Sequence, residues 1–79
     1  VVPADKLAAE TEALAARLAA GPPIAYRYMK ENLNRAVNGE MAECLDLEVT
    51  HHVHTGKTED HRNAAQAFVE KRAPVFKGR

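Results

Sequence analysis

Large aromatic side chains are scarce in this sequence. Its 79 residues include no tryptophan, two phenylalanines and two tyrosines. Much of the apolar content is alanine, which favours helix but supplies little core volume. A chain of this length is near the size at which burial only just offsets chain entropy. We therefore expect at most one domain, residues 1–79, which buries part of its apolar surface against another domain or subunit.

Net charge and cysteine pairs are also missing. The 11 basic residues are balanced by 11 acidic ones, whereas a nucleic-acid-binding protein normally carries a basic stripe, so we expect no nucleic-acid partner. Cys44 is the single cysteine, which excludes an internal disulfide and favours a reducing, cytoplasmic setting. No apolar run approaches the roughly 18 residues needed to span a membrane, and no signal-peptide pattern opens the sequence.

Four helical segments account for almost every residue. Apolar residues recur at steps of three and four in each segment, and the alternation typical of strands is absent. The expected segments are residues 4–20, 23–37, 40–54 and 58–73, with Thr58 as the N-cap of the last and Ala73–Pro74 as its end. The predicted fold class is all-α, with about four amphipathic helices.

A histidine cluster is the one feature that suggests a metal. It consists of His51, His52, His54 and His61, and His51 and His54 are neighbours on a helix face. No Cys-x-x-Cys pattern, His-Glu-x-x-His pattern or set of acidic ligands accompanies them. We therefore predict no metal site and interpret the imidazoles as favourable partners of a helix C-terminus.

Two further side chains of the third segment could carry chemistry. Cys44 shares an apolar stripe with Met41 and Leu45, and no basic residue lies one turn away to activate its thiol. We interpret it as a small buried hydrophobe. Glu48 borders the same stripe, and a half-buried carboxylate can serve as an acid or base. We prefer an ion pair or hydrogen bond to a neighbouring helix, and we predict no catalytic residue in this chain.

The closing run carries the most specific pattern. It resembles the C-terminal signature of the crotonase (enoyl-CoA hydratase/isomerase) superfamily, approximately A-F-x-E-K-R-x-P-x-F-x-G-R. The matching residues are Ala67, Phe68, Glu70, Lys71, Arg72, Pro74, Phe76, Gly78 and Arg79, with Asp60 upstream. The opening run from Val1 to Leu7 is similar to the exit from that family's last core strand. One departure is Asn63–Ala64, where many crotonases have Glu-Gly.

The resemblance covers the last third of a typical crotonase and implies the C-terminal helical region of that fold, without its catalytic α/β core. The implied activity is hydration or isomerisation of an acyl-CoA thioester through an enolate. The implied partners are an acyl-CoA substrate and copies of the same chain in a trimer or hexamer. No covalently bound cofactor is implied, only the coenzyme A moiety of the substrate. The alternative is a free-standing helical interaction module without catalysis.

Phe68 and Lys71 are the candidate binding residues. Their spacing predicts that a ring and an ammonium emerge on one helical face, where they could contact a purine and a phosphate. The spacing alone equally permits Phe68 in a core and Lys71 on the last helical carbonyls. In crotonases the matching pair contacts the adenosine end of coenzyme A, and the resemblance therefore implies a cofactor-binding role here. Arg72, Lys77 and Arg79 could add an electropositive rim or form an ordinary solvated end.

Overall fold

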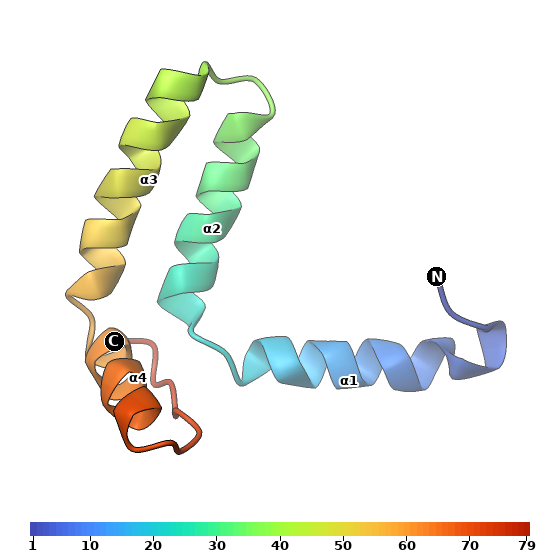
Figure 1. Ribbon diagram of the computed structural model, residues 1–79. Coiled ribbons are helices and arrows are strands. Elements are labelled where there is room, and N and C mark those ends of the chain that lie inside the picture. The colour runs from blue at the N-terminus through green and yellow to red at the C-terminus, as the bar shows by residue number, and fades with distance from the viewer.

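The computed structural model describes all 79 residues, and its only regular elements are helices (Figure 1). A short 3-10 turn, η1 (Ala4–Lys6), leads into α1 (Leu7–Ala19). The other helices are α2 (Pro23–Ala36), α3 (Met41–Gly56) and α4 (Glu59–Val69). The all-α prediction is confirmed, and none of the helices has both the length and the apolar character needed to cross a bilayer.

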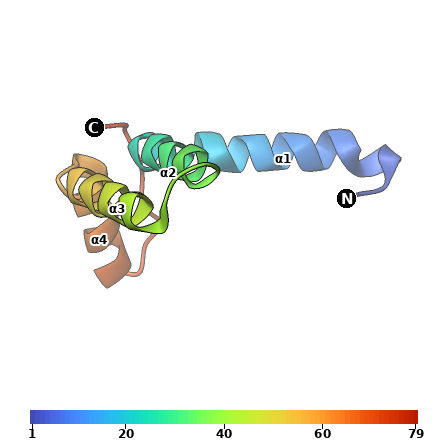
Figure 2. The same cartoon turned by 90° about the horizontal axis from the view of Figure 1, so that it is seen from above.

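The chain has almost no core of its own. Ala67 is its one buried hydrophobic residue. The radius of gyration is 15.8 Å, whereas a compact domain of this length would have roughly 12 Å. Helix α1 extends away from the other helices in both views (Figures 1 and 2), and its residues Leu7, Leu14 and Leu18 are each about half exposed. The apolar surface that this small chain cannot bury by itself is therefore exposed to solvent in the structure.

Helices α2 and α3 form an antiparallel pair whose interface is largely polar. His51 is only 7% exposed, and its Nδ1 lies 2.5 Å from Oδ1 of Asn32. Its ring lies 4.4 Å from the ring of Tyr28, and its Nε2 is 3.4 Å from a carboxylate oxygen of Glu31. The tight link between the two helices depends on Gly39, since a Cβ there would lie 2.7 Å from the carbonyl oxygen of Arg35.

The apolar stripe of α3 does not face α2. Met41, Leu45, Val49 and Val53 are between 49% and 74% exposed, while Cys44, Leu47 and Thr55 are half-buried near His51. Successive members of the stripe are four residues apart, and the buried set follows a different line along the same helix. Except for Cys44, the stripe predicted from the sequence is thus left without a partner in this chain.

The α2–α3 pair consequently has two unlike sides. A shallow hollow on one side, named here the polar side, is lined by Glu31, Asn34, Arg35, Glu43, Asp46, Leu47 and Thr50. A hydrogen-bonded ion pair of 3.2 Å joins Arg35 to Glu43 on this side. The opposite hollow, on the side named here the apolar side, is lined by Met29, Asn32, Leu33, Ala36, Cys44 and Glu48. The stripe of α3 continues this second side, because Met41 and Leu45 follow Cys44 and Glu48 around the helix.

Helix α4 begins as predicted but ends earlier. The Thr58 hydroxyl accepts a hydrogen bond of 3.0 Å from the backbone N–H of His61, which confirms the N-cap. The helix ends at Val69 rather than near Ala73, because Lys71 adopts a left-handed conformation with φ 55°. The N–H of Lys71 donates to the Phe68 carbonyl and that of Arg72 to the Ala67 carbonyl, a Schellman arrangement. The chain then turns back along α4 (Figure 1).

Candidate functional site at the end of α4

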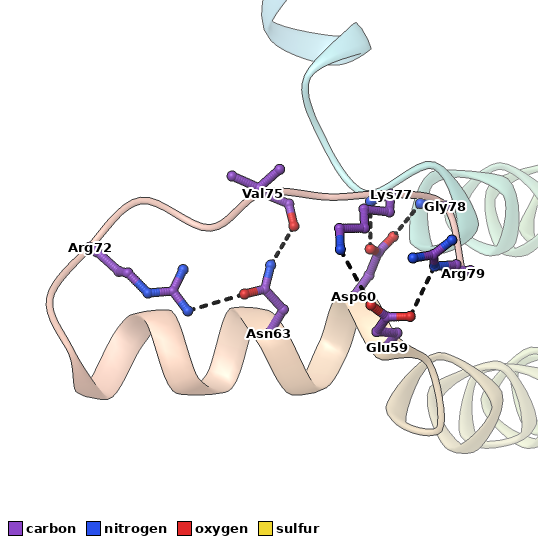
Figure 3. A network of polar contacts seen from close by, with 8 residues as sticks. All are labelled: Glu59, Asp60, Asn63, Arg72, Val75, Lys77, Gly78 and Arg79. Carbon is purple, nitrogen blue, oxygen red and sulfur yellow. Dashed lines mark hydrogen bonds and ion pairs between the residues drawn. The ribbon is translucent and has the colours of Figure 1, made fainter.

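The last ten residues, Glu70–Arg79, are named here the tail, and Asp60 fixes their far end. The Asp60 carboxylate is 4% exposed and accepts hydrogen bonds of 2.7 Å and 2.9 Å from the backbone N–H groups of Lys77 and Gly78. The Asp60 N–H donates to the Arg79 carbonyl at 2.9 Å. Asp60 also lies in the first turn of α4, where the helix dipole favours an anion. Figure 3 shows the two hydrogen bonds that the Asp60 carboxylate accepts.

Asn63, one turn further along α4, holds the near part of the tail. Its amide Nδ2 donates to the Val75 carbonyl, and its Oδ1 accepts from the Arg72 guanidinium at 3.1 Å (Figure 3). The Arg72 Nε also lies 2.5 Å from a carboxylate oxygen of Glu70. The tail is therefore tied to α4 at two successive points, Asn63 and Asp60.

Phe76 anchors the tail through an apolar contact. It is half-buried and lines a hollow beside the first turn of α2 and the end of α3, where Pro22, Ile24 and Thr55 also lie. Gly78 follows with φ 73°, a left-handed value that suits glycine, and a Cβ there would lie 3.2 Å from Pro23. The residues that carry the family resemblance at this end are largely residues that seat the tail.

The cations of the tail are mostly neutralised within the chain. Arg79 Nε and Lys77 Nζ lie 2.9 Å and 3.6 Å from the Glu59 carboxylate, and Arg72 pairs with Glu70. Lys71 forms none of the six ion pairs of the chain. The expected electropositive rim of Arg72, Lys77 and Arg79 is therefore reduced, and Lys71 is the cation left free for a ligand.

The pairing of Glu59 gives a pH prediction. A hydrogen bond from Arg79 and its charge, helped by Lys77, outweigh partial desolvation and lower the pKa of Glu59 below its ordinary value. A lowered pKa in the folded state means that the pairing is intact above the unfolded pKa of about 4.3 and is lost as pH falls through the folded value. We expect the Arg79 side chain to detach only in acid, below the ordinary pKa of a glutamate carboxyl. NMR titration of the Glu59 carboxyl carbon checks this, and a midpoint at or above the ordinary value contradicts it.

The structure corrects the geometry that was expected of Phe68 and Lys71. Lys71 lies beyond the last residue of α4 in a left-handed turn, so the two residues do not share a helical face. Phe68 is 85% exposed and is not part of a core in this chain. Both side chains are nevertheless exposed at the same end of α4, on either side of the turn. Their assignment to a cofactor stays a prediction.

The structure also places the other candidate residues, which are the histidines, Cys44 and Glu48. His51 is enclosed between α2 and α3, His54 stacks on Tyr28 at 5.9 Å, and no three potential metal ligands lie close together. Cys44 is half-buried on the apolar side. Neither the ion pair nor the hydrogen bond considered for Glu48 is present: Glu48 is exposed, and Glu31 and Glu43 form the ion pairs of this region.

Sequence reasoning missed the roles of Asp60 and Asn63. Asp60 was matched only as part of the resemblance, and Asn63 was noted only as a departure from it. The tail groups that their side chains contact lie between 9 and 18 residues further along the chain, beyond the reach of any helical spacing. An acidic residue in the first turn of α4 was the one local signal, and it is explained equally well by the dipole.

Comparisons with known proteins agree with this description of the chain. The family model described as "Enoyl-CoA hydratase/isomerase" matches residues 1–79. The chain belongs to the enoyl-CoA hydratase/isomerase family. The resemblance in the closing run is thereby confirmed, and so is the expected fold class, the C-terminal helical part of a crotonase-type fold.

Individual members of the enoyl-CoA hydratase/isomerase family are similar to this chain over nearly all of its length. The "Probable enoyl-CoA hydratase echA8" of Mycobacterium tuberculosis is 40% identical over 76 residues, which are 96% of this chain and 30% of the relative. The "1,2-epoxyphenylacetyl-CoA isomerase" of Escherichia coli is 33% identical over 79 residues, which are 100% of this chain and 30% of the relative. The crystal structure of an enoyl-CoA hydratase from Bacillus anthracis superposes on this chain with a TM-score of 0.91 at 32% identity. The superposition covers 100% of this chain and 31% of the Bacillus anthracis chain.

The chain thus spans less than a third of the length of these family members. Its arrangement of helices is shared with them even though it buries a single hydrophobic residue by itself. Open helices with uncovered apolar residues are what a part of a larger fold presents when it is viewed alone.

Proposed function

We propose that this chain is the C-terminal helical portion of an enzyme that acts on acyl-CoA thioesters through an enolate. The larger protein would polarise the thioester carbonyl and hydrate an enoyl group or move its double bond. The portion described here, residues 1–79, contributes subunit packing and a lid over the coenzyme A cleft. The observation that carries the proposal is the family match over residues 1–79.

The apolar side of the α2–α3 pair and the exposed leucines of α1 supply the surface for subunit packing. Met29, Leu33 and Leu45 are between 53% and 70% exposed, which is costly for a free surface and useful at an interface. Tyr28, on the same helix as Met29 and Leu33, instead packs against His51. We propose a trimer or a hexamer as the assembly of the larger protein.

Cofactor contact is the role that we assign to Phe68 and Lys71. An exposed ring can lie against the adenine of coenzyme A, and a free ammonium can reach its phosphates. Two features support this assignment: the 85% exposure of Phe68 and the absence of an ion pair at Lys71. No residue of this chain is assigned to the chemical step. We place the enzyme in the cytoplasm, in keeping with the single, half-buried Cys44.

An activity comparison tests the proposed function. The purified 79-residue chain is expected to show no turnover of crotonyl-CoA, because none of its residues is assigned to stabilising the enolate. A longer protein that contains this segment is expected to turn over an enoyl-CoA ester. Turnover by the short chain contradicts our view of its role, and failure of the longer protein on a panel of enoyl-CoA esters favours the non-catalytic interaction module.

A further inference from the structure

Asp60 and Asn63 form what we call the clasp, which closes the tail onto α4. Asp60 is nearly fully buried, and both of its carboxylate oxygens accept from tail N–H groups. Asn63 uses its oxygen for Arg72 and its nitrogen for Val75. Each polar atom of these two side chains therefore already has a hydrogen-bond partner within the chain.

The clasp acts on the segment that contains the strained turn. Lys71 has φ 55°, a conformation that costs a residue with a Cβ about 1 kcal/mol or more relative to glycine. Such a turn persists when its surroundings fix it from both sides. On one side it is fixed by the Schellman hydrogen bonds to Ala67 and Phe68. On the other side the next residue, Arg72, is held by Asn63, and the chain beyond it is held by Asp60.

We infer that Asp60 and Asn63 are positioning residues for the Lys71 ammonium, and that the clasp sets the affinity for the nucleotide end of the substrate without touching it. The inference rests on the proposed function, because it takes Lys71 to be the cation that meets the phosphates of coenzyme A. When the clasp opens, the tail leaves α4 and the turn relaxes. The Lys71 ammonium is then no longer held in one position. The buried Asp60 carboxylate is then also exposed and repels an anionic ligand.

The test uses Asp60→Asn in the longer protein that contains this segment, with Glu59→Gln as the matched control. Both changes convert a carboxylate to an amide at adjacent positions, but Glu59 holds only the Lys77 and Arg79 side chains. Limited trypsin cleavage after Arg72 measures release of the tail, because peptides that begin at Ala73 are identified by mass. We expect Asp60→Asn to accelerate this cleavage about tenfold or more, the loss of a hydrogen bond to a charged group, and Glu59→Gln to change it less than about threefold.

Kinetics with two substrates separate positioning from a merely structural role. Asp60→Asn should raise KM for an enoyl-CoA ester about fivefold or more while kcat stays near the original value. KM for the matching enoyl-pantetheine ester, which lacks the nucleotide, should stay unchanged. Asn63→Asp keeps the acceptor for Arg72 and loses the donor to Val75, and it should give the same pattern to a smaller extent. This milder variant decides the test if Asp60→Asn does not fold.

The outcomes distinguish the inference from the proposed function. Faster tail cleavage with an unchanged ratio of the two KM values overturns the inference, as does an equal rise of KM for both esters. Unchanged cleavage in both clasp variants also overturns it. Lys71→Ala, measured beside them, reports on the proposed function alone. If only Lys71→Ala affects the CoA ester, the proposed cofactor contact holds and the clasp is not its positioning device.

Discussion

Glutamate at both Leu45 and Val49 is expected to abolish self-association of the chain. These residues are 53% and 64% exposed on the stripe of α3 that continues the apolar side. Burial of an apolar side chain of this size contributes about 1.5–3 kcal/mol, and an unpaired carboxylate in its place adds a desolvation penalty. The combined loss corresponds to a fall in association constant of more than about a hundredfold.

Sedimentation velocity at tens of micromolar measures the effect, a range suited to weak association. We expect the unaltered chain to sediment as an oligomer and the Leu45→Glu/Val49→Glu variant as a monomer with its helices retained by circular dichroism. The matched control is Asn34→Glu/Thr50→Glu, which adds the same two charges on the polar side and should sediment like the unaltered chain. A compact monomer for the unaltered chain, or equal behaviour of the two variants, contradicts the assignment of the apolar side.

The helices of this fold were predictable because their limits are encoded locally. The expected segments begin within a few residues of α1, α2, α3 and α4, and Thr58 caps α4 as a local motif. The end of α4 was missed for a physical reason. Left-handed turns are usually made by glycine, and a lysine at position 71 gives no such sign, so the sequence predicts an end at Ala73–Pro74 instead.

The partners of the helices were not predictable from periodicity. A stripe of apolar residues shows that a face is to be buried, but not by what. In α3 the face that meets α2 is centred on His51 and its contact with Asn32, while the stripe with Leu45 and Val49 is left open. Polar contacts of this kind depend on side-chain geometry between two helices, which no single-helix pattern contains.

The candidate site, too, was predictable only in part. Phe68 and Lys71 came from the resemblance, and the helical spacing offered for them was wrong in geometry because Lys71 lies outside α4. The tail contacts of Asp60 follow from long-range folding of residues 77 to 79 onto the first turn of α4. The structure therefore gives a reason for the closing run that the sequence did not: most of it seats the tail, and Lys71 is the member left free.

Replacement of Lys71 by alanine in the longer protein is expected to weaken binding of coenzyme A esters by about 1–2 kcal/mol, the scale of a partly screened, charge-assisted contact. This corresponds to a KM about five- to thirtyfold higher. The nucleotide end is remote from the reacting carbon, so kcat should change little. Phe68→Ala should act in the same direction without opening a cavity in this chain, since the ring is 85% exposed. Thermal unfolding shows whether Phe68 also packs in an assembled interface.

Lys71→Gly is the variant that separates binding from stability at this position. Glycine adopts φ 55° without the Cβ penalty, so it should stabilise the end of α4 by up to about 1 kcal/mol, while alanine keeps the strain. Both variants remove the ammonium and should raise KM for the CoA ester alike, although their stabilities move apart. An acyl-pantetheine ester is the substrate control and should be unaffected by either change. If Lys71→Ala impairs the pantetheine ester as much as the CoA ester, Lys71 is structural and the cofactor assignment is wrong.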